Sequence, residues 1–63
     1  MAQFHEIMRK KREDKGLSQY KLAELTGVQQ STINHIEAGR RHPSFELLIK
    51  LCEVLEIPLF GEG

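Results

Sequence analysis

The fold is decided by two consecutive runs of sequence, LSQYKLAELTGV at residues 17–28 and QQSTINHIEAGR at residues 29–40. Each run carries one short predicted helix, over residues 18–25 and 30–38, because apolar side chains recur in both at helical spacing. So few residues join the two helices that they must cross sharply and cannot fold back as an antiparallel hairpin. The spacing therefore predicts a helix-turn-helix over about residues 18–38.

The residue types around the turn fit this sharp crossing. Ser18 is a strong helix N-cap, and Leu17 before it can pack on Leu22, the fourth helical residue. Ala23 is small enough to let the two backbones approach, and Gly27 accepts the positive φ that the turn needs. We expect four apolar side chains from this region to share one core: Leu22, Val28, Ile33 and Ile36.

Two further helices are predicted on either side of the motif. Residues 3–15 repeat apolar side chains at helical spacing, and Gly16 can end that helix in a left-handed conformation. The last helix begins after the N-cap Ser44, carries an apolar stripe from Leu47 to Leu55 that includes Cys52, and is ended by Pro58. The predicted fold class is all-α, a compact bundle of four or five short helices.

Length and composition exclude several classes of protein. With 63 residues, we expect one domain over residues 1–63. Cys52 is the one cysteine, and no Cys/His cluster has zinc spacing, so we expect no disulfide, no metal and no cofactor. No nucleophile is paired with a base, which predicts no enzymatic activity. No apolar run approaches the ~20 residues that span a bilayer, so we expect a cytoplasmic protein without a membrane partner.

Charge is unevenly distributed along a chain whose formal net charge is zero. Residues 1–43 carry eight Lys and Arg against five Asp and Glu, whereas residues 44–63 carry one Lys against four Glu. A basic cluster at residues 9–12 lies within the first predicted helix, where we expect one or two side chains near phosphate and the others in solvent. This asymmetry is compatible with a nucleic-acid face and a separate partner face.

The helix-turn-helix run, extended by Pro43 and Ser44, resembles the lambda-repressor-like (XRE or Cro-type) family of DNA-binding proteins over roughly residues 4–59. The resemblance implies four or five short helices, the third of which lies in the DNA major groove. It also implies an ion pair between Arg12 and Glu37.

The resemblance assigns DNA contacts to eight residues. Gln19 would contact a phosphate, and Arg40 and Arg41 would hold the DNA backbone. The third predicted helix lacks on its polar face the Lys–Glu pairs of an ordinary solvated helix, and its Gln and Asn side chains can pair with adenine. Five residues would face base edges or nearby phosphates: Gln29, Gln30, Ser31, Asn34 and His35.

Three features depart from the family pattern. Thr26 replaces the usual apolar residue before the turn glycine. Gln29 stands where Ser or Thr commonly caps the third helix, so that cap is expected to be weak. The chain also stops where the family usually forms its fifth helix, which often contributes to dimerisation.

The function that follows from the resemblance is a sequence-specific DNA-binding transcriptional regulator, a repressor. We expect a homodimer on double-stranded DNA with a palindromic operator, held together through the fourth helix and residues 57–60. An antitoxin with a toxin partner and a restriction–modification controller remain alternatives on the same fold. A protein–protein adaptor is less favoured because the polar face carries no apolar patch, and an RNA-binding module because no exposed aromatic pair is present.

Overall fold

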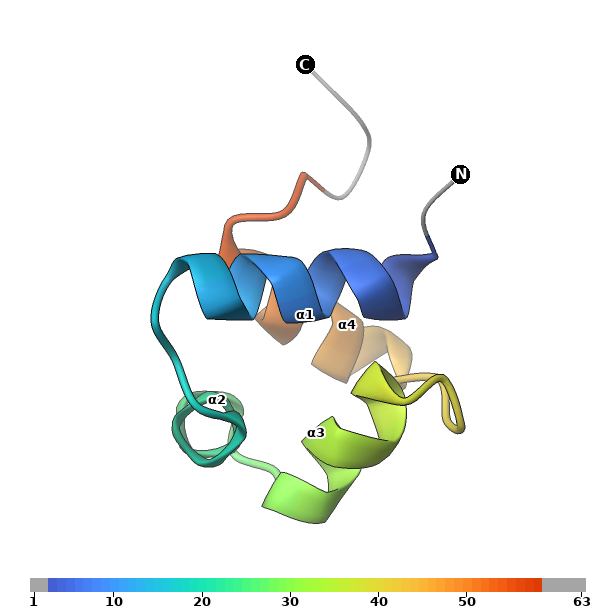
Figure 1. Ribbon diagram of the computed structural model, residues 1–63. Coiled ribbons are helices and arrows are strands. Elements are labelled where there is room, and N and C mark those ends of the chain that lie inside the picture. The colour runs from blue at the N-terminus through green and yellow to red at the C-terminus, as the bar shows by residue number, and fades with distance from the viewer. Residues whose placement is uncertain (1–2, 59–63) are drawn as a thin grey trace.

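The computed structural model describes residues 3–58 and places four helices in them. These are α1 (Phe4–Asp14), α2 (Gln19–Thr26), α3 (Gln30–Glu37) and α4 (Phe45–Leu55). Figure 1 shows α1 and α4 together at one side of the bundle, and α2 and α3 crossing at the other. The all-α class and the helix-turn-helix of the sequence prediction are confirmed.

The core lies where the four helices meet and receives side chains from each of them. Ile33 and Leu22 are fully buried, as the spacing predicted, while Val28 packs against the core but is only half-buried. Cys52 is buried too, and this burial raises the pKa of its thiol. The largest fully buried side chains are Met8, Leu22, Ile33, Ile36, Leu51 and Leu55.

Both ends of α2 are set by the predicted residues. The Ser18 hydroxyl accepts a hydrogen bond from the Lys21 backbone N–H at 2.9 Å, and Gly27 takes a left-handed conformation with φ of 75°. Thr26, the departure from the family pattern, is buried, and its hydroxyl donates to the Leu22 carbonyl at 2.8 Å. That bond satisfies the hydroxyl inside the core, which explains why a polar residue is tolerated there.

The end of α4 agrees with the prediction, in which the apolar stripe of the helix runs to Leu55 and Pro58 ends it. The helix ends at Leu55 with Glu56 as a left-handed C-cap, and Pro58 follows two residues later, where it cannot continue the helix and disfavours a helical conformation at Ile57. Glu56 turns the chain with a φ of 58°, and its carboxylate pairs with the Lys15 ammonium at 3.0 Å.

This ion pair joins the ends of α1 and α4. The hydrogen bond from Lys15 holds the pKa of Glu56 below its ordinary value. Its contribution to stability is therefore present above the pKa that Glu56 has in the unfolded chain, and is lost as the pH falls through the folded value. Leu59 and Phe60, which the sequence assigned to a dimer interface, lie outside the described residues. Within residues 3–58, no helix is long and apolar enough to cross a membrane.

Truncating Ile33 to Ala should remove a fully buried side chain from the centre of the fold. We expect a loss of about 2–5 kcal/mol in the free energy of unfolding, measured by urea denaturation with circular dichroism. Leu25→Ala is the matched control, because Leu25 is 49% exposed and should cost less than about 1 kcal/mol. Equal losses in the two variants would show that α3 does not supply the core in this way.

Candidate nucleic-acid interface

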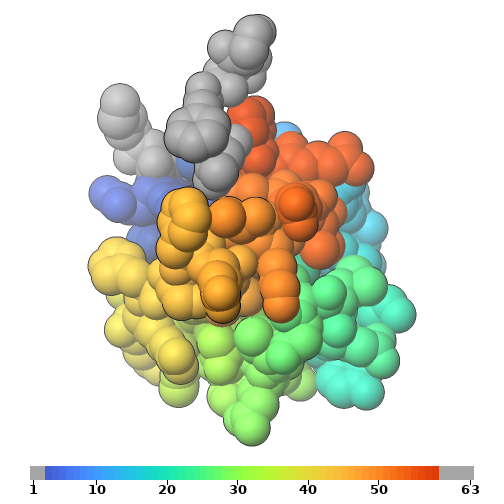
Figure 2. Space-filling model, turned by 180° about the vertical axis from the view of Figure 1, so that it is seen from behind, coloured from blue at the N-terminus to red at the C-terminus, as the bar shows by residue number. Residues whose placement is uncertain are grey.

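The two faces of α3 have opposite chemistry. Ile33, Ile36 and Glu37 are buried against the other helices. The five predicted contact residues are exposed on the helix and at its N-cap: Gln29, Gln30, Ser31, Asn34 and His35. Figure 1 shows α3 beginning at the edge of the bundle far from α1, and Figure 2 shows the start of α3 projecting at the lower edge of the molecule. The amide-rich end of α3 is therefore the protruding one.

The cap of α3 is weak, as predicted. Gln29 occupies the N-cap position, and its side chain makes no capping hydrogen bond. Helix α3 is held instead by its buried face, since a helix of eight residues is marginal without tertiary packing. The side chain of Gln29 is therefore not engaged in capping α3.

A buried ion pair joins α1 to the end of α3. Arg12 Nε donates to Glu37 Oε2 at 2.7 Å, and its second nitrogen Nη2 donates to Glu37 Oε1 at 3.0 Å. The remaining nitrogen, Nη1, donates to the Leu17 carbonyl at 2.7 Å. The side chains of Arg12 and Glu37 are only 11% and 2% exposed. The ion pair implied by the family resemblance is thus present, in bidentate form.

The hydrogen bond to Glu37 is also the main cause of a raised Arg12 pKa, which outweighs the opposing effect of burial. An arginine guanidinium is not deprotonated in proteins, so Arg12 keeps its positive charge beside Glu37. This charge contacts the buried end of α3 through the carboxylate of Glu37.

Gln19 belongs to the same network. Its side-chain nitrogen Nε2 donates to Glu37 Oε1 at 3.0 Å, and its oxygen Oε1 accepts from Asn34 Nδ2 at 3.4 Å. The structure thus brings together two of the predicted contact residues, Gln19 from α2 and Asn34 from α3. The phosphate contact of Gln19 stays a prediction.

Arg40 and Arg41 lie beyond the other end of α3, in the loop that leads to α4, and both are exposed. Gly39 turns the chain there with a φ of 76°, and the Arg40 backbone N–H donates to the His35 carbonyl at 3.0 Å. The side chains of Arg40 and Arg41 therefore lie beyond the opposite end of α3 from Gln30, and the polar face of the helix lies between them and Gln30.

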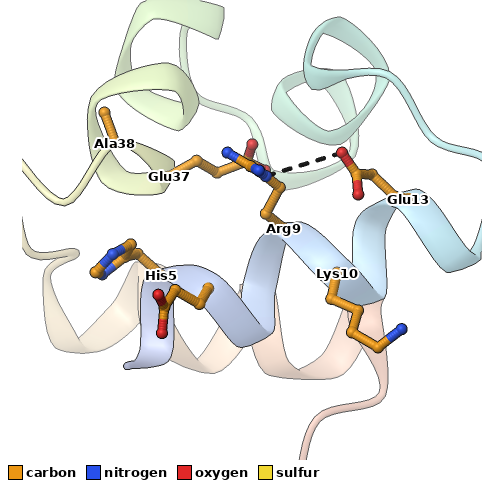
Figure 3. Close-up of a pocket in the computed structure, with 7 residues that line it drawn as sticks. His5, Arg9, Lys10, Glu13, Glu37 and Ala38 are labelled. Atoms are coloured by element: carbon orange, nitrogen blue, oxygen red, sulfur yellow. Dashed lines mark ion pairs between the residues drawn. The ribbon is translucent and has the colours of Figure 1, made fainter. Parts of the chain in front are cut away.

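A hollow of about 580 Å³ lies between α1 and the end of α3 (Figure 3). Its lining is mixed in charge, and Arg9 pairs there with Glu13 at 3.8 Å. Opposite charges that neutralise one another offer little to a charged ligand. Among residues 3–58, no group of three His, Cys, Asp or Glu side chains is placed to hold a metal ion. The lining residues are His5, Glu6, Arg9, Lys10, Glu13, Glu37 and Ala38.

Two further residues, Arg9 and Tyr20, lie beside the predicted contacts. Arg9 lines a small hollow together with Gln19 and Asn34. Tyr20 is 64% exposed and lines another hollow together with Gln30. The sequence pattern places Arg9 only within a basic cluster and Tyr20 only within a predicted helix. The sequence signal that could have identified Tyr20 as a surface residue beside the predicted contacts is an aromatic side chain in the first turn of a helix.

Comparison with known proteins decides the family. A family model described as Helix-turn-helix matches residues 8–61. The chain belongs to this helix-turn-helix family. It is the XRE or Cro-type family that the sequence resembles, and its members are DNA-binding regulators, not enzymes.

Two solved structures are similar over most of the chain. The restriction-modification controller protein C.AhdI from Aeromonas hydrophila is 38% identical with a TM-score of 0.81, and the match covers 87% of this chain and 83% of that one. The clp gene regulator ClgR from Corynebacterium glutamicum is 35% identical with a TM-score of 0.78, covering 82% and 55%.

A curated relative, named as an HTH-type transcriptional regulatory protein of Methanocaldococcus jannaschii, is 36% identical over 53 residues. These residues are 84% of this chain, but the chain spans only 17% of the length of that relative.

Removing one member of the Arg12–Glu37 pair should be costly. Glu37→Ala leaves a buried guanidinium without its partner, and we expect a loss of about 3–5 kcal/mol in the free energy of unfolding. Replacing both residues with apolar ones, Arg12→Met with Glu37→Leu, should cost less than Glu37→Ala alone because no charge is stranded. Urea denaturation of the two variants and the parent measures this, and a double variant that is less stable than Glu37→Ala would contradict a stranded charge as the source of the cost.

Proposed function

We propose that this chain is a sequence-specific transcriptional regulator, a repressor that binds its operator as a homodimer. The observation that carries this proposal is the exposed amide-rich face of α3, which protrudes while the opposite face is anchored by a buried ion pair. A face of this kind suits the B-DNA major groove, which is about 12 Å wide and admits one helix.

Base contacts fall to the exposed face of α3. Gln30 stands at the first helical position and is exposed, so its amide is free to donate and accept at once. Those two bonds match the N6 and N7 edge of adenine. Ser31 can bond to any base edge, and His35 lies one turn further along the same helix.

Contacts with the DNA backbone fall to the cations around α3. Arg40 and Arg41 are exposed in the loop beyond α3, where they can follow the phosphates at the rim of the groove. Each neutralised phosphate releases counterions, so affinity falls steeply as salt rises. Contacts of this kind place the protein on the duplex but carry no sequence information.

A dimer supplies the contacts that one small module lacks, because single modules bury too little surface for tight specific binding. Helix α4 offers the interface. Phe45 at its start is 68% exposed, and half-buried Leu48 and Ile49 follow at helical spacing. In Figure 2, α4 crosses the middle of the face opposite to the one viewed in Figure 1.

A second candidate function is that of a restriction–modification controller. The likeness to C.AhdI favours it, because the match covers 83% of that protein at 38% identity. An antitoxin with a toxin partner remains a prediction from the sequence. The genes beside this one distinguish the three, since a controller lies beside a methyltransferase or endonuclease gene and an antitoxin beside a toxin gene.

Selection of bound sites from random duplex DNA, read beside the mass of the protein in solution, tests the proposed function. We expect a palindromic site with half-site centres about 34–36 Å apart and a protein mass of two chains on it. A monomer that binds one half-site tightly would contradict the dimer, and selection that enriches no sequence would contradict the regulator itself.

Gln30→Ala should relax base preference at one position in each half-site, because the amide that pairs with adenine is lost. The expected discrimination lost is about 1–3 kcal/mol, measured by binding to operators changed at each position in turn. Arg40→Ala is the matched control, and should lower affinity about equally on all sequences and reduce the salt slope. An unchanged base profile in folded Gln30→Ala would move the assignment to Ser31.

A further inference from the structure

The orientation of the Gln19 amide is determined by the carboxylate that it faces. An ionised carboxylate only accepts hydrogen bonds, so the part of the Gln19 amide turned toward Glu37 must be the NH₂ group. Glu37 cannot turn away, because Arg12 holds both of its oxygens at 2.7 and 3.0 Å. The Gln19 carbonyl oxygen, Oε1, therefore points away from Glu37.

The Gln19 oxygen in turn selects the orientation of Asn34. An amide oxygen only accepts, so the group of Asn34 that meets it must be its own NH₂, and Nδ2 donates there at 3.4 Å. The Asn34 oxygen, Oδ1, is then left facing outward. Asn34 is exposed on the polar face of α3, so this oxygen is available to a ligand.

We infer that Asn34 is a specificity-determining residue that presents an acceptor oxygen to the major groove, and that Gln19 is the positioning residue that orients it. This inference rests on the proposed function. The base that satisfies an outward acceptor is one with an exocyclic amino group in the groove, which is adenine at N6 or cytosine at N4. Guanine and thymine present only acceptors at that edge, so the acceptor alone specifies which base of a pair Asn34 contacts, and the identity of the pair depends on the second hydrogen bond.

Adenine should rank above cytosine at this position. The Asn34 amide has two hydrogens, and only one of them is used by Gln19. The second can reach N7 of adenine while Oδ1 accepts from N6, a pairing that cytosine cannot offer. A freely rotating asparagine would turn its NH₂ outward as readily and so accept guanine or thymine as well.

The test compares base profiles, selected from random duplex DNA, for the parent, Asn34→Ala and Gln19→Met. Asn34→Ala identifies the operator position by losing its preference for an A·T pair. Gln19→Met keeps the length of the side chain but has no amide, so the same preference should fall by about fivefold at that position. Preference at the position assigned to Gln30 should not change in Gln19→Met.

Three outcomes would overturn the inference while leaving the proposed function intact. Asn34→Ala could change no position of the profile. The parent could prefer a G·C pair, in either orientation, at the position that Asn34→Ala identifies. Gln19→Met could bind more weakly on all sequences with an unaltered profile, which is the result expected if Gln19 only contacts phosphate. A parent protein that selects no site at all would instead contradict the proposed function.

Gln19→Met also removes a partner of Glu37 and could unfold the protein, which a thermal melt reveals. If Gln19→Met does not fold, a measurement on the parent protein tests the inference instead. In the complex with its selected site, nuclear Overhauser contacts between the Asn34 amide protons and the Gln19 side chain are expected. Their absence, with the Asn34 amide protons near guanine or thymine, would overturn the inference.

Discussion

The bidentate pair between Arg12 and Glu37 is the interaction on which the arrangement of the helices depends. It joins α1 to the end of α3, and through the Leu17 carbonyl it also fixes the entry to α2. Taking both charges out of water is expensive, and the cost is offset only when every donor and acceptor finds a partner. That condition is met, because no buried side-chain nitrogen or oxygen in residues 3–58 lacks a hydrogen-bond partner.

The pair also decides which face of α3 is turned outward. Apolar contacts through Ile33 and Ile36 bury one side of the helix but are not directional, so they leave some freedom of rotation. Glu37 removes that freedom, because its carboxylate must meet the Arg12 nitrogens in one geometry. The Arg12–Glu37 pair therefore holds Gln30 and Asn34 on the outer face of α3, although neither residue contacts Arg12 itself.

Short-range chemistry explains which parts of this structure were predictable from sequence. Ser18 and Gly27 set the backbone conformation within one helical turn of their own positions, so the helix-turn-helix and the ends of α2 could be predicted from the sequence. The inward bonding of Gln19 did not follow, since it joins residues 18 positions apart and depends on where the helices cross. The end of α4 did follow from the sequence, because the steric effect of Pro58 acts on the residue directly before it.

The exposed faces of the helices differ in what they contribute to their own stability. Ion pairs at helical spacing join Arg9 to Glu13 and Lys10 to Asp14 in α1, and Lys21 to Glu24 in α2. In the described part of the chain no ion pair joins two residues of α3, and its N-cap is unsupported by a side chain. Such pairs contribute only about 0.2–0.5 kcal/mol each, so α3 loses little without them. Because the buried face stabilises the helix, the outer side chains of α3 are not needed for its stability and remain available to bind a ligand.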